Sequence, residues 1–369
     1  MEKKKILFIN NNFQYSDGTV RALIGMVNNM DLNKFDITVK GLFYFHKELV
    51  KEVKPEIKVE PCFGFYFRGF KRIVKLLPAK FWYKKFVKDD YDIEVAYQCD
   101  LPTLMVGAST NEKAVHIEWM HGYENYPKQY AKADRVVCVS RHNEERCRKE
   151  CNGNVNVTHL YNLVDDSIVT NKSSLDVPSE LNFSNKRKPL FVTVGRLSPE
   201  KGYVRLVEIM KDLSDEGFDF SLVIVGGGAE ESSIRKAISE THMEERIFLT
   251  GKQNNPYNIV SQADCFICSS FSEGYSTACT EAALLGIPII TTCVAGGKEI
   301  IETCECGLLT ELDDESLKAG IRTVLKNPEF LSQWKETLNT TKEKFSLKSR
   351  VKEMNDFFDE VYELSEGKK

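Results

Sequence analysis

The chain has 369 residues, of which 42% are hydrophobic and 28% charged, a balance typical of folded globular proteins. Its net charge of −4 gives no reason to expect a nucleic-acid partner. A chain of this length is too long for one ordinary hydrophobic core, so we expect two domains.

No stretch of the sequence approaches the roughly 20 consecutive apolar residues that span a membrane. The apolar run after Lys5 is too short for a secretory leader, so we expect none. The eleven cysteines lie mostly in apolar runs, which favours buried, reduced thiols. These features predict a cytoplasmic protein.

Strand-like and helix-like segments alternate along residues 1–166. Apolar strand patterns occupy 4–11, 35–43, 92–98, 113–122 and 135–141, and helical patterns lie between several of them. This alternation predicts a Rossmann-like parallel sheet with helices on both faces. A polar stretch rich in Ser, Asn and Lys follows at 167–188 and indicates a linker.

The alternation begins again after this stretch. Strand patterns occupy residues 189–195, 220–228, 246–251, 264–270 and 288–294, and helical patterns lie between them. We therefore expect a second doubly wound α/β domain over 189–345. The last segment, 346–369, has the pattern of an amphipathic helix.

The segment 264–286 has the pattern of a strand, a glycine turn and a helix, and we interpret it as the centre of the site. Its turn contains Glu273, and Glu281 follows eight positions later within the helix. Such a unit points the free N–H groups of a helix N-terminus at the carboxyl edge of the sheet. An anion site between two carboxylates suits a ligand with central phosphates and sugars at both ends. The turn and the helix start also supply Gly274, Tyr275, Ser276 and Thr277.

A loop with two cations, VGRLSPEKG at 194–202, follows the first strand of the second domain. Arg196 and Lys201 flank its turn, and two cations at the carboxyl end of a strand suit a diphosphate. The alternative is a solvated basic turn. Gly226 opens a glycine turn at the same sheet edge, where it either admits a nucleotide to the backbone or makes a tight strand-to-helix turn.

The first domain offers candidates on two loops. Asp17 and Gly18 precede a helix whose N–H groups either meet an anion or form a plain capping turn. His121 follows a strand and either points into the site or packs structurally. Asp90 and Asp92 have the spacing of an acidic metal motif, but they precede their strand, away from the site, so we expect no metal ion.

The stretch 68–88 is basic and aromatic. It holds eight Lys or Arg, from Arg68 to Lys88, and no acid, with nine large apolar side chains between them. This pattern suits peripheral contact with an anionic membrane surface or with a lipid diphosphate. The alternative is a helix whose apolar side faces the core and whose basic side faces water.

Combined and in this order, the motifs resemble the retaining glycosyltransferases of family 4, a group 1 family. The resemblance rests on VGRLSPEKG, IVGGG, EGYSTACTE with its two glutamates, and ALLGIPIITT in the second domain. In the first domain it rests more loosely on the loop before the helix, on WMH at 119–121 and on YNLVD at 161–165. It implies the GT-B fold, in which two Rossmann-like domains face a cleft and the final helix crosses back to the first.

The resemblance also implies roles for these residues. A nucleotide sugar, with UDP favoured as the nucleotide, would be the donor, and no separate cofactor is expected. Arg196 and Lys201 would hold the diphosphate, Glu281 the ribose and Glu273 the transferred sugar. The base would lie near Lys252 in the stretch 249–255.

For the first domain, the resemblance implies that His121 approaches the transferring sugar and that Asp17 and Gly18 lie near phosphate and sugar. Asp17 departs from the family, whose members commonly carry glycine there, and a carboxylate beside phosphate is unfavourable. The acceptor would be a glycan or a lipid-linked sugar of a surface polysaccharide or glycolipid. An enzyme acting on it would work in the cytoplasm or at the inner face of the membrane.

Two other functions stay open at this point. One is a sugar-nucleotide epimerase or hydrolase of the same fold, which would need an acid–base pair or an activated water in the cleft. The other is a non-catalytic protein that binds nucleotide sugars, which would be expected to lack Arg196, Lys201 or Glu273.

Overall fold

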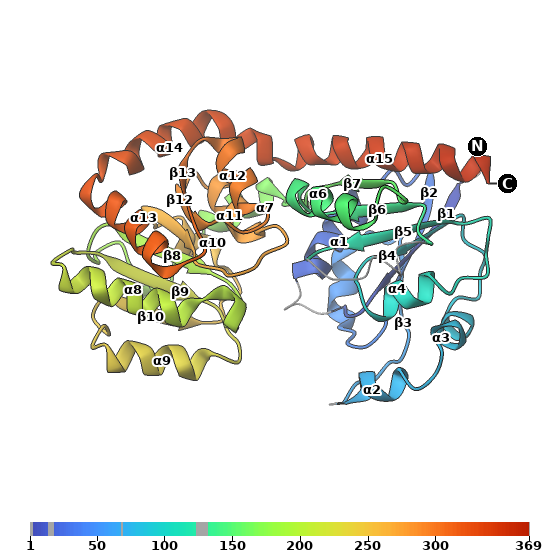
Figure 1. Cartoon of the computed structure of the whole chain (residues 1–369), viewed down its shortest axis with the longest axis horizontal. Helices are drawn as coiled ribbons and strands as arrows, with labels where there is room; N and C mark the ends of the chain where they lie inside the picture. Colours follow the sequence, from blue (N-terminus) through green and yellow to red (C-terminus); the bar gives the residue numbers. More distant parts are fainter. Residues whose placement is uncertain (1–2, 14–17, 68, 123–131, 369) are drawn as a thin grey trace. The chain divides into compact units, whose positions relative to one another are not determined.

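The structure, a computed structural model, describes residues 3–13, 18–67, 69–122 and 132–368. The chain divides into two compact units (Figure 1). Unit 1 comprises Met1–Leu163 together with Arg350–Lys369, and unit 2 comprises Val164–Ser349. Within the described ranges, no helix is long and apolar enough to cross a bilayer.

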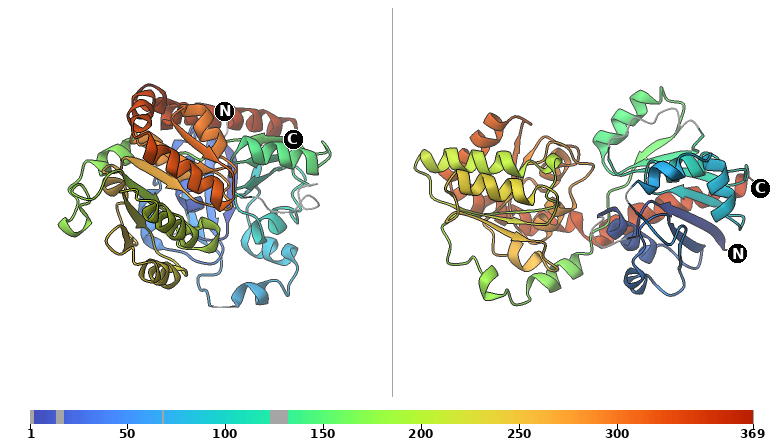
Figure 2. Two further views of the ribbon diagram at one scale, coloured as in Figure 1. Left: turned by 60° about the vertical axis from the view of Figure 1, so that its left-hand side comes forward. Right: turned by 90° about the horizontal axis from the view of Figure 1, so that it is seen from below.

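Unit 1 is built on a seven-stranded parallel sheet with the order β3-β2-β1-β4-β5-β6-β7. Its strands are β1 (Lys4–Asn10), β2 (Phe35–Gly41), β3 (Lys58–Pro61), β4 (Ile93–Ala96), β5 (Val115–Met120), β6 (Arg135–Cys138) and β7 (Val157–His159). Its helices include α1 (Gly18–Asn29), α2 (Phe70–Val74), α3 (Ala79–Phe86), α4 (Leu101–Val106) and α6 (Arg141–Glu150). Helices lie on both sides of the sheet (Figure 2), which is why β1 and β4 are almost wholly buried.

Unit 2 is built on a six-stranded parallel sheet with the order β10-β9-β8-β11-β12-β13. Its strands are β8 (Leu190–Val194), β9 (Ser221–Val225), β10 (Ile247–Gly251), β11 (Cys265–Cys268), β12 (Ile289–Thr292) and β13 (Gly307–Thr310). Its helices are α7 (Asp166–Ser173), α8 (Tyr203–Asp215), α9 (Glu231–Glu240), α10 (Tyr257–Val260), α11 (Thr277–Leu284), α12 (Gly297–Cys304), α13 (Asp314–Lys326) and α14 (Glu329–Thr341). The strand order reverses between β8 and β11, and such a reversal opens a crevice at the carboxyl ends of the two strands. The predicted pair of doubly wound α/β sheets is confirmed.

The last helix, α15 (Leu347–Gly367), packs against the sheet of unit 1. Phe358 lies at its centre, and its ring meets the rings of Phe8 and Phe35 edge-on at centroid distances of 6.3 and 5.9 Å. The end of the helix is fixed by an ion pair between Lys4, which is buried at the start of β1, and Glu366. This contact places the C-terminal turn of the helix beside the first strand.

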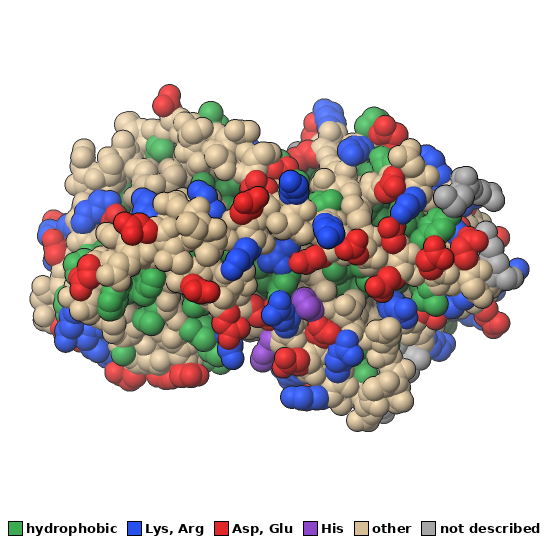
Figure 3. Space-filling model, turned by 90° about the horizontal axis from the view of Figure 1, so that it is seen from above, with side chains coloured by type: hydrophobic (Ala, Val, Ile, Leu, Met, Phe, Trp, Pro, Cys, Tyr) green, Lys and Arg blue, Asp and Glu red, His purple; other side chains and the backbone are tan. Residues whose placement is uncertain are grey.

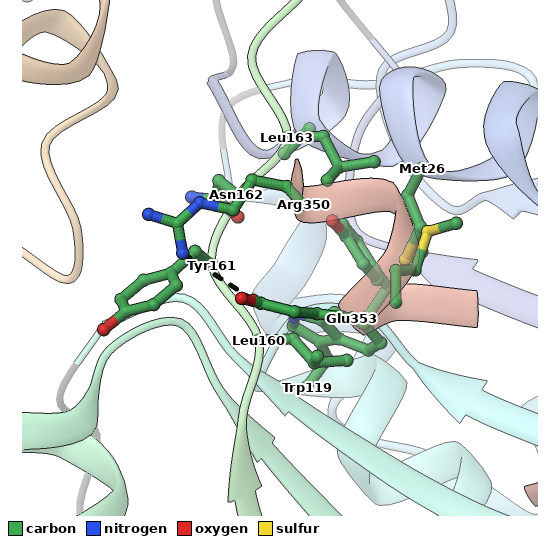
Figure 4. Close-up of a pocket in the computed structure, with 11 residues that line it drawn as sticks. Met26, Trp119, Leu160, Tyr161, Asn162, Leu163, Arg350 and Glu353 are labelled. Atoms are coloured by element: carbon green, nitrogen blue, oxygen red, sulfur yellow. Dashed lines mark ion pairs between the residues drawn. The ribbon is translucent and has the colours of Figure 1, made fainter. Parts of the chain in front are cut away.

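The start of α15 encloses a small cavity in unit 1 (Figure 4). Arg350 is almost completely buried there, with its guanidinium carbon 3.9 Å from the centre of the Tyr161 ring and an ion pair of 3.7 Å to Glu353. Trp119 and Met26 line the same cavity. The cationic head of Arg350 is therefore stabilised by an aromatic face and a carboxylate as α15 joins unit 1.

The stretch 167–188, predicted as a linker, belongs to unit 2. Its first part is α7, which packs against α10 and α11. Side chains near α10 bind its backbone: the amide of Asn255 donates to the carbonyl of Lys172 at 2.8 Å, and Gln262 accepts from the amide of Phe183 at 3.0 Å. The Phe183 side chain is buried. The composition indicates a linker because only two apolar side chains of 167–188, Val169 and Phe183, are buried, and a few polar bonds complete the anchoring.

Candidate functional site

The candidate site lies in unit 2, where two loops leave the carboxyl ends of the adjacent strands β8 and β11. The loop after β8 continues into a short 3-10 helix, Pro199–Lys201, and then into α8. The loop after β11 leads into α11. Since β8 and β11 flank the reversal of strand order, both loops border the expected crevice.

An ion pair joins the two loops at this point. The ammonium group of Lys201 lies 2.6 Å from Glu273 Oε1, and the two side chains are only 22% and 11% exposed. The hydroxyl of Ser270 donates to the same carboxylate oxygen at 2.7 Å. Burial works against the charged amine, but the charge of Glu273 and its hydrogen bond outweigh that effect and raise the pKa of Lys201. A cation and an anion are thus held at the edge of the sheet in fixed positions.

The backbone of the two loops is also tied together. The amide of Phe271 donates to the carbonyl of Glu200 at 2.8 Å, and the hydroxyl of Ser269 donates to the carbonyl of Lys201 at 2.9 Å. Gly202 has a left-handed φ of 66°, and a Cβ there would lie 2.5 Å from the carbonyl oxygen of Ser269. Only glycine permits this approach, which places Lys201 beside the second loop.

Arg205, on α8, holds the loop after β11 in place through hydrogen bonds to its backbone. Its guanidinium donates to the carbonyl of Ser269 at 2.5 and 3.1 Å and to the carbonyl of Leu312 at 2.5 Å. It also lies 3.7 Å from the centre of the Phe271 ring and is 6% exposed. The sequence motifs do not single out this residue. The available signal was a cation within the apolar helical run YVRLV, because a buried cation requires partners.

The helix α11 begins where the sequence predicted an anion site. Ser276 is the N-cap residue, and its hydroxyl accepts from the amide of Cys279 at 3.3 Å. Tyr275 is buried against the backbone of Gly296, so its ring contributes to packing, whereas Gly274 and Thr277 are partly exposed. The capped start of α11 therefore lies beside the Lys201–Glu273 pair, and Lys201, Glu273 and Ser276 line one small cavity.

Glu281 lies inside α11 rather than on the loop. Its carboxylate accepts a hydrogen bond of 3.0 Å from the hydroxyl of Tyr257, at the start of α10. Burial raises the pKa of Glu281 to about 7, although this hydrogen bond acts in the opposite direction. The carboxylate is therefore poised between its two protonation states near neutral pH, a property typical of functional sites.

The remaining candidates of unit 2 fall at the same edge. Arg196 is exposed on the loop after β8, and Lys252 is exposed directly after β10. A Cβ at Gly226 would lie 1.8 Å from the carbonyl oxygen of Gly195. Close packing of the loops after β8 and β9 therefore requires this glycine, in agreement with the tight-turn alternative.

The candidates in unit 1 occupy the carboxyl edge of the other sheet. His121 directly follows β5, is partly buried, and its ring centroid lies 4.6 Å from that of Tyr97. Gly18 opens α1 after β1, while Asp17 lies outside the described residues. Asp92 precedes β4 and accepts from the amide of Lys5 at 2.9 Å, so it has a structural partner at the amino edge. Among the described residues, no group of three His, Cys, Asp or Glu could hold a metal ion.

Comparison with known proteins agrees with this architecture. Residues 179–340 match the family described as "Glycosyl transferases group 1". The chain is 27% identical over 219 residues to a Campylobacter jejuni protein, an N-acetylgalactosamine-N,N'-diacetylbacillosaminyl-diphospho-undecaprenol 4-alpha-N-acetylgalactosaminyltransferase, with 58% of this chain and 57% of that protein covered. It is 26% identical to an Escherichia coli UDP-Gal:alpha-D-GlcNAc-diphosphoundecaprenol alpha-1,3-galactosyltransferase, over 49% of this chain and 48% of that protein. The matches thus span about half the length of these curated relatives.

Solved structures extend the likeness to the whole fold. HepE of Anabaena, crystallised with UDP and glucose, superposes with a TM-score of 0.76 over 97% of this chain and 99% of that protein, at 17% identity. Sucrose-phosphate synthase from Thermosynechococcus elongatus also superposes with a TM-score of 0.76, at 16% identity over 98% of this chain and 100% of that protein. The group 1 glycosyltransferase match thus covers residues 179–340, and the solved structures show the same fold over nearly the whole chain.

Proposed function

We propose that the chain is a retaining, metal-independent glycosyltransferase that moves a hexosyl group from a UDP-sugar to a glycan or lipid-linked acceptor. The observation that carries the proposal is the Lys201–Glu273 ion pair beside the start of α11, within the matched family domain. A phosphate-binding cation and a hydroxyl-binding carboxylate in contact suit a ligand in which a diphosphate is joined directly to a sugar.

The diphosphate is the leaving group of this reaction. Lys201, Arg196 and the N–H groups at the start of α11 would stabilise the negative charge that develops on it. When a donor binds, its phosphate oxygens share the ammonium group of Lys201 with Glu273. Glu273 then accepts hydrogen bonds from hydroxyls of the sugar, whose transition state resembles an oxocarbenium ion.

The other parts of the donor and acceptor are assigned as follows. Glu281 binds the ribose hydroxyls, and the backbone near Lys252 and Gly226 meets the base and nucleotide. His121 and Gly18 of unit 1 are assigned to the transferring sugar. Two relatives are named for acceptors with a diphospho-undecaprenol group, which favours a lipid-linked acceptor for this chain.

A panel of nucleotide sugars tests the proposal. Release of nucleoside diphosphate is measured with and without an undecaprenyl-diphosphate sugar, and with and without a chelator, and NMR assigns the anomeric configuration of the product. We expect one UDP-sugar to react, only with acceptor, with retention and in the presence of chelator. Equal release without acceptor would indicate a hydrolase, a changed sugar without release an epimerase, and binding without turnover a non-catalytic protein.

A further inference from the structure

In unit 1, residues 65–88 contain α2 and α3 and are called the α2–α3 segment below. This segment exposes an unusual amount of apolar surface. Eleven large hydrophobic side chains among the described residues are exposed, and six of them lie between Phe65 and Phe81. These six are Phe65 (60%), Phe67 (49%), Ile73 (51%), Leu76 (80%), Leu77 (44%) and Phe81 (47%). A cluster of this kind usually marks a surface that binds another protein or a membrane.

Buried residues of α2 and α3 anchor the two helices that carry these exposed side chains. Phe70 and Val74 on α2, and Trp82 and Tyr83 on α3, are buried in the core of unit 1. The indole N–H of Trp82 donates to the carbonyl of Val74 at 2.8 Å and links the two helices. The aromatic residues of the stretch 68–88 therefore divide into an inner set that fills the core and an outer set that faces away from it. The exposed apolar residues are therefore carried by well-packed helices, and their exposure is not caused by poor packing of the segment.

Cations surround the exposed apolar residues. From Gly69 to Lys88 the sequence has seven Lys or Arg and no acid. The basic side chains exposed in this stretch are Arg72, Lys75, Lys80, Lys84, Lys85 and Lys88. On α3, Lys84 and Lys85 follow Phe81 by three and four residues and so share its outward face.

The charge pattern of the α2–α3 segment differs from that of another face of unit 1. On the face of unit 1 that carries α15, acidic and basic side chains are interspersed (Figure 3). The α2–α3 segment lies on the opposite side of unit 1 from α15 (Figures 1 and 2). A positive surface with a protruding apolar tip is complementary to anionic headgroups above a hydrocarbon layer. A second copy of the chain would oppose cation to cation, so self-association through this surface is disfavoured.

We propose that the α2–α3 segment docks unit 1 on an anionic phospholipid bilayer, with Leu76, Leu77 and Phe81 entering the headgroup boundary and the neighbouring cations contacting lipid phosphates. This inference goes beyond the transfer reaction and does not depend on it. Because both contributions are needed, binding should require anionic lipid and should weaken as salt screens the charges.

Co-sedimentation of the full chain tests the docking. The vesicles are pure phosphatidylcholine, or phosphatidylcholine with about a third phosphatidylglycerol, at low and high salt. We expect sedimentation only with the anionic vesicles at low salt. The charge variant R72Q/K80Q/K84Q should lower partitioning on the order of 100-fold, since each of the three cations contributes about a factor of five. The apolar variant L76S/L77S/F81S should lower it roughly tenfold or more.

Matched variants of exposed residues in unit 2 serve as controls. K236Q/K298Q/K326Q and L175S/L312S should sediment like the native chain. Nucleoside diphosphate binding should stay unchanged in every variant, which also shows that each variant is folded. A tryptophan at the most exposed position, L76W, should be quenched by brominated anionic lipids, whereas L175W should not.

Three results would overturn the proposal. They are no binding to anionic vesicles at low salt, equal binding to neutral and anionic vesicles, or a dimer in sedimentation equilibrium that the apolar variant abolishes. None of them bears on glycosyl transfer, because donor turnover with a water-soluble acceptor is measured separately.

Discussion

Lys201 and Glu273 are 72 residues apart in the sequence, yet the ammonium nitrogen of one lies 2.6 Å from a carboxylate oxygen of the other. The two groups were assigned separate tasks from the sequence, one on phosphate and one on sugar. Their contact means that neither acts alone, because any anion that approaches Lys201 competes with Glu273. Charge and hydrogen bonding at this point depend on both loops at once.

The first prediction concerns this pair. Replacing Lys201 with Ala should weaken nucleoside diphosphate binding by roughly 10- to 150-fold, equivalent to about 1.5–3 kcal/mol for one charge-assisted contact. It should also destabilise the fold, because Glu273 stays largely buried without its partner. Calorimetry and thermal unfolding measure the two effects.

A double variant separates the two effects. K201A/E273Q should recover most of the lost stability, because no buried charge is left unpaired, but it should not recover binding. K211A, which removes a surface ion pair with Asp215 on α8, should change both quantities little. Unchanged diphosphate affinity in the Lys201→Ala variant would refute the assignment.

The second prediction concerns the pH dependence of stability. Glu118 on β5 is 3% exposed, and burial raises its pKa to about 8. The unfolded pKa is about 4.3, so the folded state binds this proton more tightly. Its contribution to stability is complete below about pH 4 and is lost as the pH rises through 8.

Replacing Glu118 with Gln should remove this dependence. The native chain should lose stability relative to the E118Q variant by at most about 1.4 kcal/mol for each pH unit between pH 5 and 8. Urea unfolding of both proteins across this range measures the difference, and comparison cancels the titration of other groups. An exposed counterpart, E112Q, should follow the native curve. Parallel curves for the native and E118Q proteins would show that Glu118 does not titrate in this way.

The third prediction concerns Arg205. Lysine at this position keeps the charge but has no planar fork, so it cannot serve the carbonyls of both Ser269 and Leu312. The loop that carries Glu273 should lose its support, and kcat/KM for the nucleotide sugar should fall roughly tenfold or more. The affinity for free nucleoside diphosphate should fall less than that for the intact donor.

R235K on α9 is the matched control, since Arg235 is exposed and forms a surface ion pair with Glu231 within the same helix. It should leave steady-state kinetics unchanged. If R205K behaved in the same way, Arg205 would have no part in positioning the loop.

The sequence predicted the features that depend on local pattern. Alternating apolar segments indicated both sheets, and the Ser276 helix start appeared where the turn residues placed it. The contact between Lys201 and Glu273 could not be predicted, because it requires β8 and β11 to be neighbours in the sheet. The hydrophobic periodicity of a sequence predicts strands but not their order. For the same reason, neither Arg205 nor the partner of Glu281 was identified.

Burial of individual aromatic residues was equally beyond the pattern. The stretch 68–88 has the same composition whether its rings face inward or outward, and packing against the core of unit 1 determines which ones are inside. In 167–188, low hydrophobicity indicated a linker, whereas the buried Val169 and Phe183 and a few amide hydrogen bonds fix the segment on unit 2.

The fourth prediction concerns Glu281 and the pH dependence of donor binding. A carboxylate accepts hydrogen bonds from ribose hydroxyls better than a carboxylic acid does. With a pKa of about 7, raised by burial, Glu281 should be protonated below neutral pH and ionised above it. Affinity for the intact nucleotide sugar should therefore rise between pH 6 and 8 and level off. The intact donor is the better probe, because it lacks the terminal phosphate of a free diphosphate, which titrates near about pH 6.

Two variants distinguish the glutamates in this experiment. E281Q should bind the donor more weakly at pH 8 and lose the rise with pH, and it should weaken free nucleoside diphosphate as well, because the ribose belongs to both ligands. E273Q should weaken the intact donor more than the free diphosphate, because only the donor carries the sugar, and it should keep the rise. Calorimetry at pH 6, 7 and 8 with both ligands measures all of these quantities. The opposite pattern, with Glu273 controlling the pH dependence, would exchange the two roles and place the ribose at the loop after β11.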